Sequence, residues 1–525
     1  MGSEMCIRDR CNDILAENRI PDDWKYSTLV PIFKGRGDSL DCGNYRGLKL
    51  TDHALKVYER VLERRIREQV HINEMQFGFM PGKGTTDAIF IVRQLQEKYL
   101  AKKKDLYFAF VDLEKAFDRV PREVVKWALR KLYVDEWLVQ AVMTLYEDAK
   151  TSVRFGGEAS ESFDVKVGLH QGSVLSPLLF VIVMNATSSG VASGLPYEIL
   201  YADDLALIAE SEAELQEKLK SWDEGLTSKG LRVNVNKTKV MRSEKCEGVA
   251  PVKCKYPCSV CSRNVGQSSI QCTDCRLWTH RKCSEVKGSL IAASGSFKCK
   301  RCSGAMPAVS RSLMKDMTLE RGNCESVSRF CYLGDMLERG GGSQAAVTAR
   351  IQSGWKKFHD LSAFLTSRAT PYWMKGKIYS SCVRPCMMYG SETWGLTAID
   401  KKRLETSERR MVRWMCGVSL KDGIASKDLL HRLKIRSVEE EMKTGRLRWY
   451  GHVVRRDGDN WLKRTWKMKV EGPTPRGRPK KTWEETISAD CRSLGLNVGD
   501  ALNRDSWRAA IKNNRPTQRS WRNGR

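Results

Sequence analysis

The sequence lacks a long hydrophobic run. Its most apolar stretch, SPLLFVIVMNA at 176–186, is far shorter than the roughly 20 residues that a membrane-spanning helix requires. No signal peptide pattern is visible at the N-terminus. We therefore expect no membrane partner. The first ten residues, MGSEMCIRDR, have no periodic pattern and look like junction sequence rather than native protein.

The sequence has far fewer acidic than basic residues. The 525 residues include 90 Lys and Arg but 63 Asp and Glu, a formal net charge of +27. From Lys421 to the C-terminus there are 26 basic and 13 acidic residues. Such an excess points to a polyanionic partner, nucleic acid before an anionic membrane surface, and a basic soluble surface is the simpler alternative. The length and the 41% hydrophobic content predict a globular chain of three or more units.

The 18 cysteines lack the secretory context of a disulfide scaffold, and their clustering between Cys254 and Cys302 indicates metal binding in a reducing compartment. A segment of some 45 residues has no large core, so zinc must fold it, and eight ligands make two tetrahedral sites. Unmetallated cysteines are the alternative. The eight expected ligands are Cys258, Cys261, Cys272, Cys275, His280, Cys283, Cys299 and Cys302.

Two adjacent carboxylates interrupt the apolar stretch LYADDLALIA at 200–209. Its flanks predict two short strands, Glu198–Tyr201 and Leu205–Ala209, that fold back on each other. Like charges at the tip of a partly buried hairpin repel, and burial raises the cost of charging them, so a cation between them is expected. A solvated turn is the alternative for a motif this short.

A second strand, FAFVDL, ends on Asp112. Placed beside the hairpin, it makes Asp112 converge with Asp203 and Asp204, and three such oxygen donors suit Mg²⁺. Two ions about 3.5–4 Å apart would clamp the attacking and leaving oxygens of a phosphoryl transfer. The order of the surrounding elements is β-α-β-β-α-β-like, which predicts an α+β core with helices packed on one sheet face.

The motifs resemble those of the reverse transcriptases of non-long-terminal-repeat (LINE-like) retrotransposons, in the right order over most of 21–510. The resemblance implies a right-hand polymerase of fingers, palm and thumb, with an inserted zinc domain and a basic, mainly helical C-terminal region. The motifs are VPIFKGRGDSLDCGNYRGLKL, MQFGFMPGKGTTDAI, FAFVDLEKAFDRVP, GLHQGSVLSPLLFVIVMNA, YADDLALIA, GLRVNVNKTKVM, FCYLGDML, VRPCMMYGSETW and RLRWYGHVVRR. The implied divisions are 1–20 junction and linker, 21–104 fingers, 105–245 palm, 246–305 zinc insertion, 306–342 end of palm, 343–420 thumb and 421–525 nucleic-acid-binding region.

The resemblance assigns roles to matching positions. It makes Asp112, Asp203 and Asp204 the ligands of two catalytic Mg²⁺ ions. Phe117 matches the steric gate that excludes a ribose 2′-hydroxyl, and Lys237 matches the lysine that protonates pyrophosphate. A core aromatic and a surface lysine are the plainer interpretations of those two residues. The substrate-binding positions are Arg46, which meets the triphosphate, and Gln171 and Gly172, which pack on the nucleotide. Tyr201 stands where these elements usually carry Phe.

The cysteine-rich insertion resembles a plant-homeodomain (PHD) finger. By that resemblance one zinc ion is held by Cys258, Cys261, His280 and Cys283, and the other by the remaining four cysteines. Such fingers often bind histone tails, and a structural or RNA-binding role is the alternative.

The tail motif PTPRGRPKKTW looks like an AT-hook for the minor groove, and unstructured phosphate contacts are the alternative. Its nucleic-acid-binding candidates are Arg476, Arg478, Lys480 and Lys481. The tryptophans of this region either stack on bases or form a small helical core.

The expected function is RNA-directed DNA polymerisation, with an RNA template, a DNA primer and deoxynucleoside triphosphates as partners and chromatin as a further one. Action in the nucleus, with a cytoplasmic ribonucleoprotein stage, is expected. No nuclease motif is visible, so the chain looks like a fragment of a longer polyprotein. A domesticated zinc-finger adaptor without activity is the main alternative, and a group II intron-type maturase is another.

Overall fold

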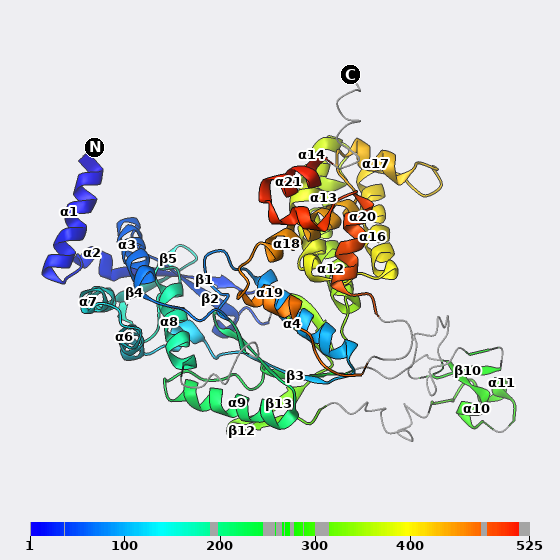
Figure 1. The fold of residues 1–525 in the computed structure, drawn as a ribbon, viewed down its shortest axis with the longest axis horizontal. Coiled ribbons are helices and arrows are strands. Elements are labelled where there is room, and N and C mark those ends of the chain that lie inside the picture. Colours follow the sequence, from blue (N-terminus) through cyan, green and yellow to red (C-terminus); the bar gives the residue numbers. More distant parts are fainter. Residues whose placement is uncertain are drawn as a thin grey trace. The chain divides into compact units, whose positions relative to one another are not determined.

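The computed structural model describes residues 2–35, 37–189, 198–244, 258, 265–266, 268–273, 278–286, 288–299, 314–473 and 480–513. The chain divides into two compact units (Figure 1), one formed by Met1–Ser243 with Asp316–Arg525 and the other by Glu244–Lys315. Among the described residues, no helix has the length and apolar character to cross a membrane. The N-terminal stretch that the sequence left without a pattern lies in helix α1, Gly2–Glu17.

A six-stranded sheet forms the centre of the larger unit, in the order β12-β13-β9-β3-β8-β7. Strand β3 runs antiparallel to both β8 and β9, which puts the segment FAFV in the middle of the sheet. The strands are β3 Leu106–Val111, β7 Glu198–Tyr201, β8 Asp204–Ala209, β9 Lys239–Ser243, β12 Met317–Leu319 and β13 Gly322–Ser326. A central position explains why β3 is apolar on both faces.

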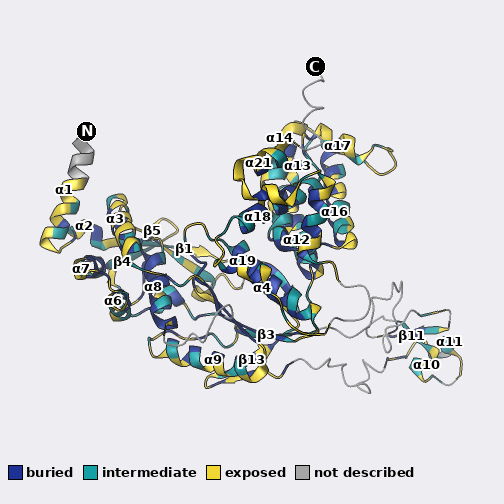
Figure 2. Cartoon of the chain, viewed as in Figure 1, coloured by how far each residue is buried: buried dark blue, intermediate teal, exposed yellow. Residues whose placement is uncertain are grey.

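Both faces of this sheet are covered, whereas the sequence predicted helices on one face. Phe108 and Phe110 pack in a core with Phe90 of α4 (Thr85–Ala101). The alternate residues, such as Ala109 and Leu207, face the side where α9 (Glu212–Thr227) contacts β3 and β8. Figure 2 shows α4 and the central strands mainly buried and α9 with an exposed outer side. On the α4 side of the sheet, C-terminal segments distant in sequence pack against α4. No local period in the sequence encodes that packing.

A second sheet is built from strands on both sides of β3 in the chain, with the strand order β2-β1-β4-β5 and with β6 paired to β4. Strand β1 pairs antiparallel with β2 and parallel with β4. Its strands are β1 Tyr26–Phe33, β2 Tyr45–Leu50, β4 Lys150–Phe155, β5 Glu158–Ala159 and β6 Phe163–Asp164. The other helices of this half are α2 Asp22–Lys25, α3 His53–Gln69, α5 Ala116–Arg119, α6 Arg122–Lys131, α7 Glu136–Thr144 and α8 Ser176–Ser188.

The C-terminal half is helical after a short hairpin of β14 (Arg329–Tyr332) and β15 (Asp335–Glu338). The tryptophans Trp461, Trp483 and Trp507 are buried in the same core as α4, so the described structure favours the helical-core interpretation over base stacking. The helices are α12 Gln344–Asp360, α13 Ser362–Leu365, α14 Tyr372–Ile378, α15 Arg384–Met388, α16 Ala398–Cys416, α17 Ser426–Arg432, α18 Val438–Val454, α19 Trp461–Lys467, α20 Trp483–Ser493 and α21 Arg504–Asn513.

The described part of the smaller unit contains two short strands and two short helices. Strands β10 (Ser269–Gln271) and β11 (Trp278–His280) pair antiparallel, and α10 (Arg281–Ser284) and α11 (Leu290–Ala293) follow. Its described core consists of Ile270, Cys272, Phe297 and Cys299. So small a core cannot offset the conformational entropy of folding by itself, which agrees with a unit that depends on metal.

Candidate active site and metal centre

Three carboxylates meet at the carboxyl end of β3. Val111 pairs with Leu205 in the antiparallel ladder, so the next residue, Asp112, lies opposite Asp204. Opposed residues in such a ladder have Cα atoms about 4.5–5.5 Å apart. Asp203 lies in the turn that joins β7 to β8, directly before Asp204. The strand register therefore brings the three predicted metal ligands together.

The turn that carries the carboxylates is strained and supported. Ala202 has a φ of 57°, in the left-handed region that a β-carbon disfavours. Its amide donates to Gln76 Oε1 at 3.1 Å, and the Gly78 amide donates to the same oxygen at 2.9 Å. The segment 75–77 also exchanges backbone hydrogen bonds with Leu200 of β7. A buried glutamine thus holds the turn against the strain of its backbone.

The electrostatics of the site favour a bound cation. Asp203 and Asp204 are exposed to solvent, yet the protein around them displaces enough water to raise both pKa values. Desolvation is the largest cause, and repulsion from Asp203 and Asp112 helps to raise the pKa of Asp204 to about 6. Arg46 and Lys237 act in the opposite direction on the pKa of Asp203, which means that both cations lie within electrostatic reach of it. A divalent ion would remove the repulsion that these cations only reduce.

Asp112 is fixed by the segment that follows α9. Asn234 donates its amide to the Asp112 carbonyl at 2.8 Å, and the Asp112 amide donates to Thr238 Oγ1 at 3.3 Å. Lys237 Nζ lies 3.3 Å from Asp112 Oδ2, an ion pair without hydrogen-bond geometry, so this buried oxygen has no hydrogen-bond donor. An acceptor of this kind, beside two further carboxylates, is an oxygen ligand suited to Mg²⁺.

The carboxylates do not form a closed cage by themselves. Among the residues that the structure describes, only one cluster has three ligand atoms within 4.8 Å of one another, and it lies in the smaller unit. Lys237 pairs with Asp112, so one of the three carboxylates already has a cationic partner.

Phe117, the predicted steric gate, packs against two other aromatic rings. Its ring stacks on Phe180 of α8 at a centroid distance of 4.6 Å and meets Phe79 edge-on at 6.4 Å. The Phe117 carbonyl accepts from the Leu169 amide at 2.7 Å, which ties it to the loop before Gln171. Phe117 is therefore a rigid, half-buried aromatic.

The loop that contains Gln171 and Gly172 lies against strand β2. The Gln171 side chain donates to Asp118 Oδ1 at 2.7 Å, and its carbonyl accepts from the Lys49 amide at 2.8 Å. Gly172 has a φ of 115°, and a β-carbon there would lie 2.4 Å from the Lys49 carbonyl oxygen. Arg46 is exposed on the same strand as Lys49. Strand β2 therefore supports the Gln171–Gly172 loop and also carries Arg46, the predicted triphosphate contact.

The sequence did not reveal the residues that hold the catalytic turn. Gln76 and Gly78 lie in the recognised motif MQFGFMPGKGTTDAI, but nothing in that motif assigned them to the turn. The one available signal was Gly78 itself, since glycine often marks a close backbone approach. A β-carbon on Gly78 would lie 2.3 Å from the Ala202 nitrogen.

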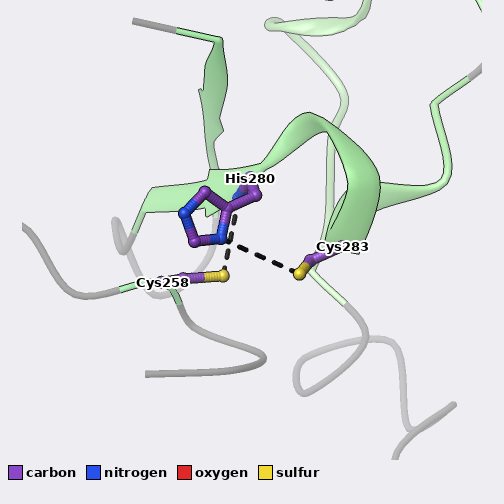
Figure 3. Close-up of side chains that lie close together, drawn as sticks. All are labelled: Cys258, His280 and Cys283. Atoms are coloured by element: carbon purple, nitrogen blue, oxygen red, sulfur yellow. Dashed lines mark hydrogen bonds between the residues drawn. The ribbon is translucent and has the colours of Figure 1, made fainter. Parts of the chain in front are cut away.

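Cys258, His280 and Cys283 form the cluster within 4.8 Å (Figure 3). The imidazole Nδ1 lies 3.8 Å from Cys283 Sγ, and the His280 amide lies 3.5 Å from Cys258 Sγ. Cys272 and Cys299 are buried together, with the Cys299 amide 3.2 Å from Cys272 Sγ. These pairs follow the two ligand sets implied by the resemblance. The ligand candidates outside the described residues are Cys261, Cys275 and Cys302.

Of the four nucleic-acid-binding candidates in the tail, two lie outside the described residues and two within them. Arg476 and Arg478 lie outside the described residues. Lys480 is exposed and donates to the Gly340 carbonyl at 2.9 Å, so its ammonium has an internal contact. Lys481 is exposed, and partial desolvation lowers its pKa.

Comparison with known proteins finds sequences similar to part of this chain. Residues 33–269 match the family of the reverse transcriptase (RNA-dependent DNA polymerase). The Pol polyprotein of the type-1 retrotransposable element R2 of Nasonia vitripennis is 29% identical over 236 residues, which are 43% of this chain and 23% of that protein. The RNA-directed DNA polymerase from mobile element jockey of Drosophila funebris is 30% identical over 242 residues, 43% of this chain and 26% of that protein.

The chain thus spans about a quarter of the length of these two relatives. Among solved structures, apo telomerase from Candida tropicalis, truncated from its C-terminal domain, gives a TM-score of 0.33 at 16% identity over 44% of this chain and 52% of that chain. Residues 33–269 are thus similar in sequence to the reverse transcriptase family, and this chain is similar to proteins of the R2 and jockey elements.

Proposed function

We propose that this protein is an RNA-directed DNA polymerase of a non-long-terminal-repeat retrotransposon, which extends a DNA primer on an RNA template. The observation that carries the proposal is the register of β3 and β8, which sets Asp112 opposite Asp204 and beside Asp203. Reverse transcriptase domains use divalent metal ions, and the raised pKa of Asp204 and the unsatisfied Asp112 Oδ2 fit such ions.

Asp112, Asp203 and Asp204 would hold the ions, which when bound lower the cost of deprotonating the primer hydroxyl and of charge on the leaving pyrophosphate. Arg46, exposed on β2 within electrostatic reach of Asp203, presents its guanidinium to the triphosphate. Lys237, whose side chain is 63% exposed, supplies a proton donor beside Asp112. The residues of the chain thus position the substrates and stabilise charge.

Phe117 and the 171–172 loop select the nucleotide. The Phe117 ring is braced by Phe180 and Phe79, so it cannot yield to a bulkier ribose. Gln171, fixed by Asp118 and by the Lys49 amide, presents a defined surface to the base pair. This arrangement supports deoxynucleotides as substrates.

For the smaller unit, we propose a PHD-type finger that binds two Zn²⁺ ions and contacts chromatin or nucleic acid. Cys258, His280 and Cys283 supply three ligands of one site, and Cys272 and Cys299 supply two of the other. Because reverse transcription primed from chromosomal DNA occurs where that DNA lies, we propose the nucleus as the place of action.

Primer extension tests the polymerase directly. The chain is incubated with an oligo(dT) primer on poly(rA), dTTP and Mg²⁺, and extension is expected. The same assay with Asp203→Ala should show none, because that carboxylate is a proposed metal ligand. Absence of extension from well-folded wild-type protein would overturn the proposed polymerase function and favour the alternative of a zinc-finger adaptor without activity.

A further inference from the structure

The motif RLRWYGHVVRR lies on α18 and just beyond it, and the proposed chemistry gives it no role. Yet its side chains contact the segment that supports the catalytic turn. His452 Nε2 lies 3.3 Å from Asp87 Oδ1, although the two residues are 365 positions apart. Arg456 donates to the Gly82 carbonyl and lies 3.2 Å from the same imidazole nitrogen. The motif therefore holds both ends of the 82–87 turn.

The 82–87 turn is itself the start of α4. The Gly84 amide donates to Asp87 Oδ2 at 2.6 Å, so Asp87 satisfies a free donor at the start of the helix and accepts from His452 at once. The Asp87 carboxylate is 5% exposed, and a buried carboxylate without its partner is costly. His452 and Asp87 therefore depend on each other.

The same segment continues to the catalytic hairpin. Lys83 donates to the Gln76 carbonyl at 3.1 Å, and Gln76 Oε1 receives the amides of Gly78 and Ala202. Gly78 packs directly against Ala202, the residue before Asp203. A continuous path of contacts thus leads from α18 through 76–87 to the turn that carries the carboxylates.

Other residues of the motif fix α18 so that this contact is rigid. Trp449 stacks on His452 at a centroid distance of 4.9 Å and meets Phe90 of α4 at 5.9 Å. Gly451 lies so close to Trp507 that a β-carbon would be 2.7 Å from its ring. Trp449 therefore packs α18 against α4, and Trp507 packs α18 against α21.

We infer that His452 and Arg456 are positioning residues of the active site, which act through the 76–87 segment to hold the Ala202–Asp203 turn. This inference rests on the proposed polymerase function. The C-terminal basic region then has a role in catalysis that is separate from any contact with nucleic acid. Because nucleotide contacts at Arg46 and Gln171 are untouched, loss of positioning lowers kcat rather than nucleotide affinity.

The test compares His452→Ala and Arg456→Ala with wild type in single-nucleotide extension. We expect kcat to fall roughly tenfold or more, KM for dTTP to stay within about twofold, and the Mg²⁺ concentration for half-maximal rate to rise. Arg456→Lys and His452→Gln, which keep a donor, should recover most of the rate. Arg455→Ala is the matched control, since Arg455 donates to the Ala501 carbonyl instead, and should keep the wild-type kcat.

Deuterium exchange gives a readout that needs no activity. Peptides covering 76–87 and 198–206 should both take up deuterium faster in Arg456→Ala than in wild type, with peptides of α9 unchanged. Faster exchange confined to α18 and 82–87, or kcat within about twofold of wild type in folded variants, would overturn the inference. Wild-type protein without extension would overturn the proposed function instead, and exchange would still report on the coupling.

Discussion

Gly78 and Ala202 touch through their backbones, with the position of a Gly78 β-carbon only 2.3 Å from the Ala202 nitrogen. The contact joins the segment before α4 to the turn that carries Asp203 and Asp204. A side chain at position 78 must displace that turn, because the obstructing atom is backbone. The position of the turn that carries the proposed metal ligands therefore depends on the absence of a side chain at Gly78.

Gly78→Ala should reduce primer extension by about 100-fold, because a shift near 1 Å at a reacting centre costs that much. Gly458→Ala is the matched control, since nothing lies within 4 Å of its β-carbon position. Both variants should have wild-type circular dichroism. Wild-type kcat in Gly78→Ala would contradict the close approach.

Asp204→Asn should stabilise the protein in metal-free buffer at pH 7.5. The pKa of Asp204 is raised from 3.8 to about 6, so ionisation costs stability as the pH rises through that window. We expect a gain of roughly 2–4 °C in Tm at pH 7.5 that disappears toward pH 4. Added Mg²⁺ should raise the Tm of wild type but not of the variant. A lower Tm of Asp204→Asn at pH 7.5 would contradict a destabilising repulsion of the Asp204 carboxylate by Asp203 and Asp112.

Phe117→Val should admit ribonucleotides. A smaller side chain opens space beside the sugar, and discrimination against rNTP should fall by about 10- to 100-fold as the ratio of kcat/KM values. Phe155→Val, on an exposed aromatic of β4, is the control and should keep the wild-type ratio. An unchanged ratio in Phe117→Val would leave Phe117 as a core aromatic.

The purified chain should contain two zinc ions by elemental analysis. Cys258→Ser and Cys272→Ser should each lose about one ion, because each removes a ligand of a different site. Chelation should make Glu244–Lys315 sensitive to protease, since metal supplies its folding energy. Cys331→Ser, an exposed cysteine of β14, is the control and should retain both ions. Full zinc occupancy in both ligand variants would refute the sites.

Glu97→Gln should stabilise the junction of α4 and α20 at high pH. Glu97 accepts from the Trp483 amide at 3.0 Å, and burial raises its pKa from 4.5 to about 7. The native state thus loses stability as the pH rises from 4.5 through 7, by on the order of 2 kcal/mol. Glutamine keeps the acceptor without the charge. Urea midpoints at pH 8 and pH 4.5 check this, with Glu217→Gln, on an exposed residue of α9, as the control.

The local patterns of the sequence predicted the parts of the site with fair accuracy. The strand that ends before Asp112 and the hairpin around Asp203 follow from apolar runs and from two adjacent acidic residues, and the register brings them together. Because short strands and their turn residues are encoded locally, these features were visible in the chain itself. The spacing of Cys258, His280 and Cys283 likewise marked one ligand cluster.

Contacts between segments distant in the chain could not be predicted from the sequence. No period in the sequence relates His452 to Asp87, Gln76 to Ala202, or the tryptophans of α20 and α21 to α4. The helix α1 also arose where no pattern was seen. These features depend on which surfaces pack together, and packing is a property of the whole fold.

The order of residues along the chain specifies the chemistry: which residues are acidic, which strands they end, and which cysteines have the spacing of zinc ligands. The geometry comes from the fold, which pairs Lys237 with Asp112 and places α18 against the segment behind the Asp203–Asp204 turn. Side-chain type and local period are written along the chain, whereas the neighbours of a buried residue are selected by long-range packing.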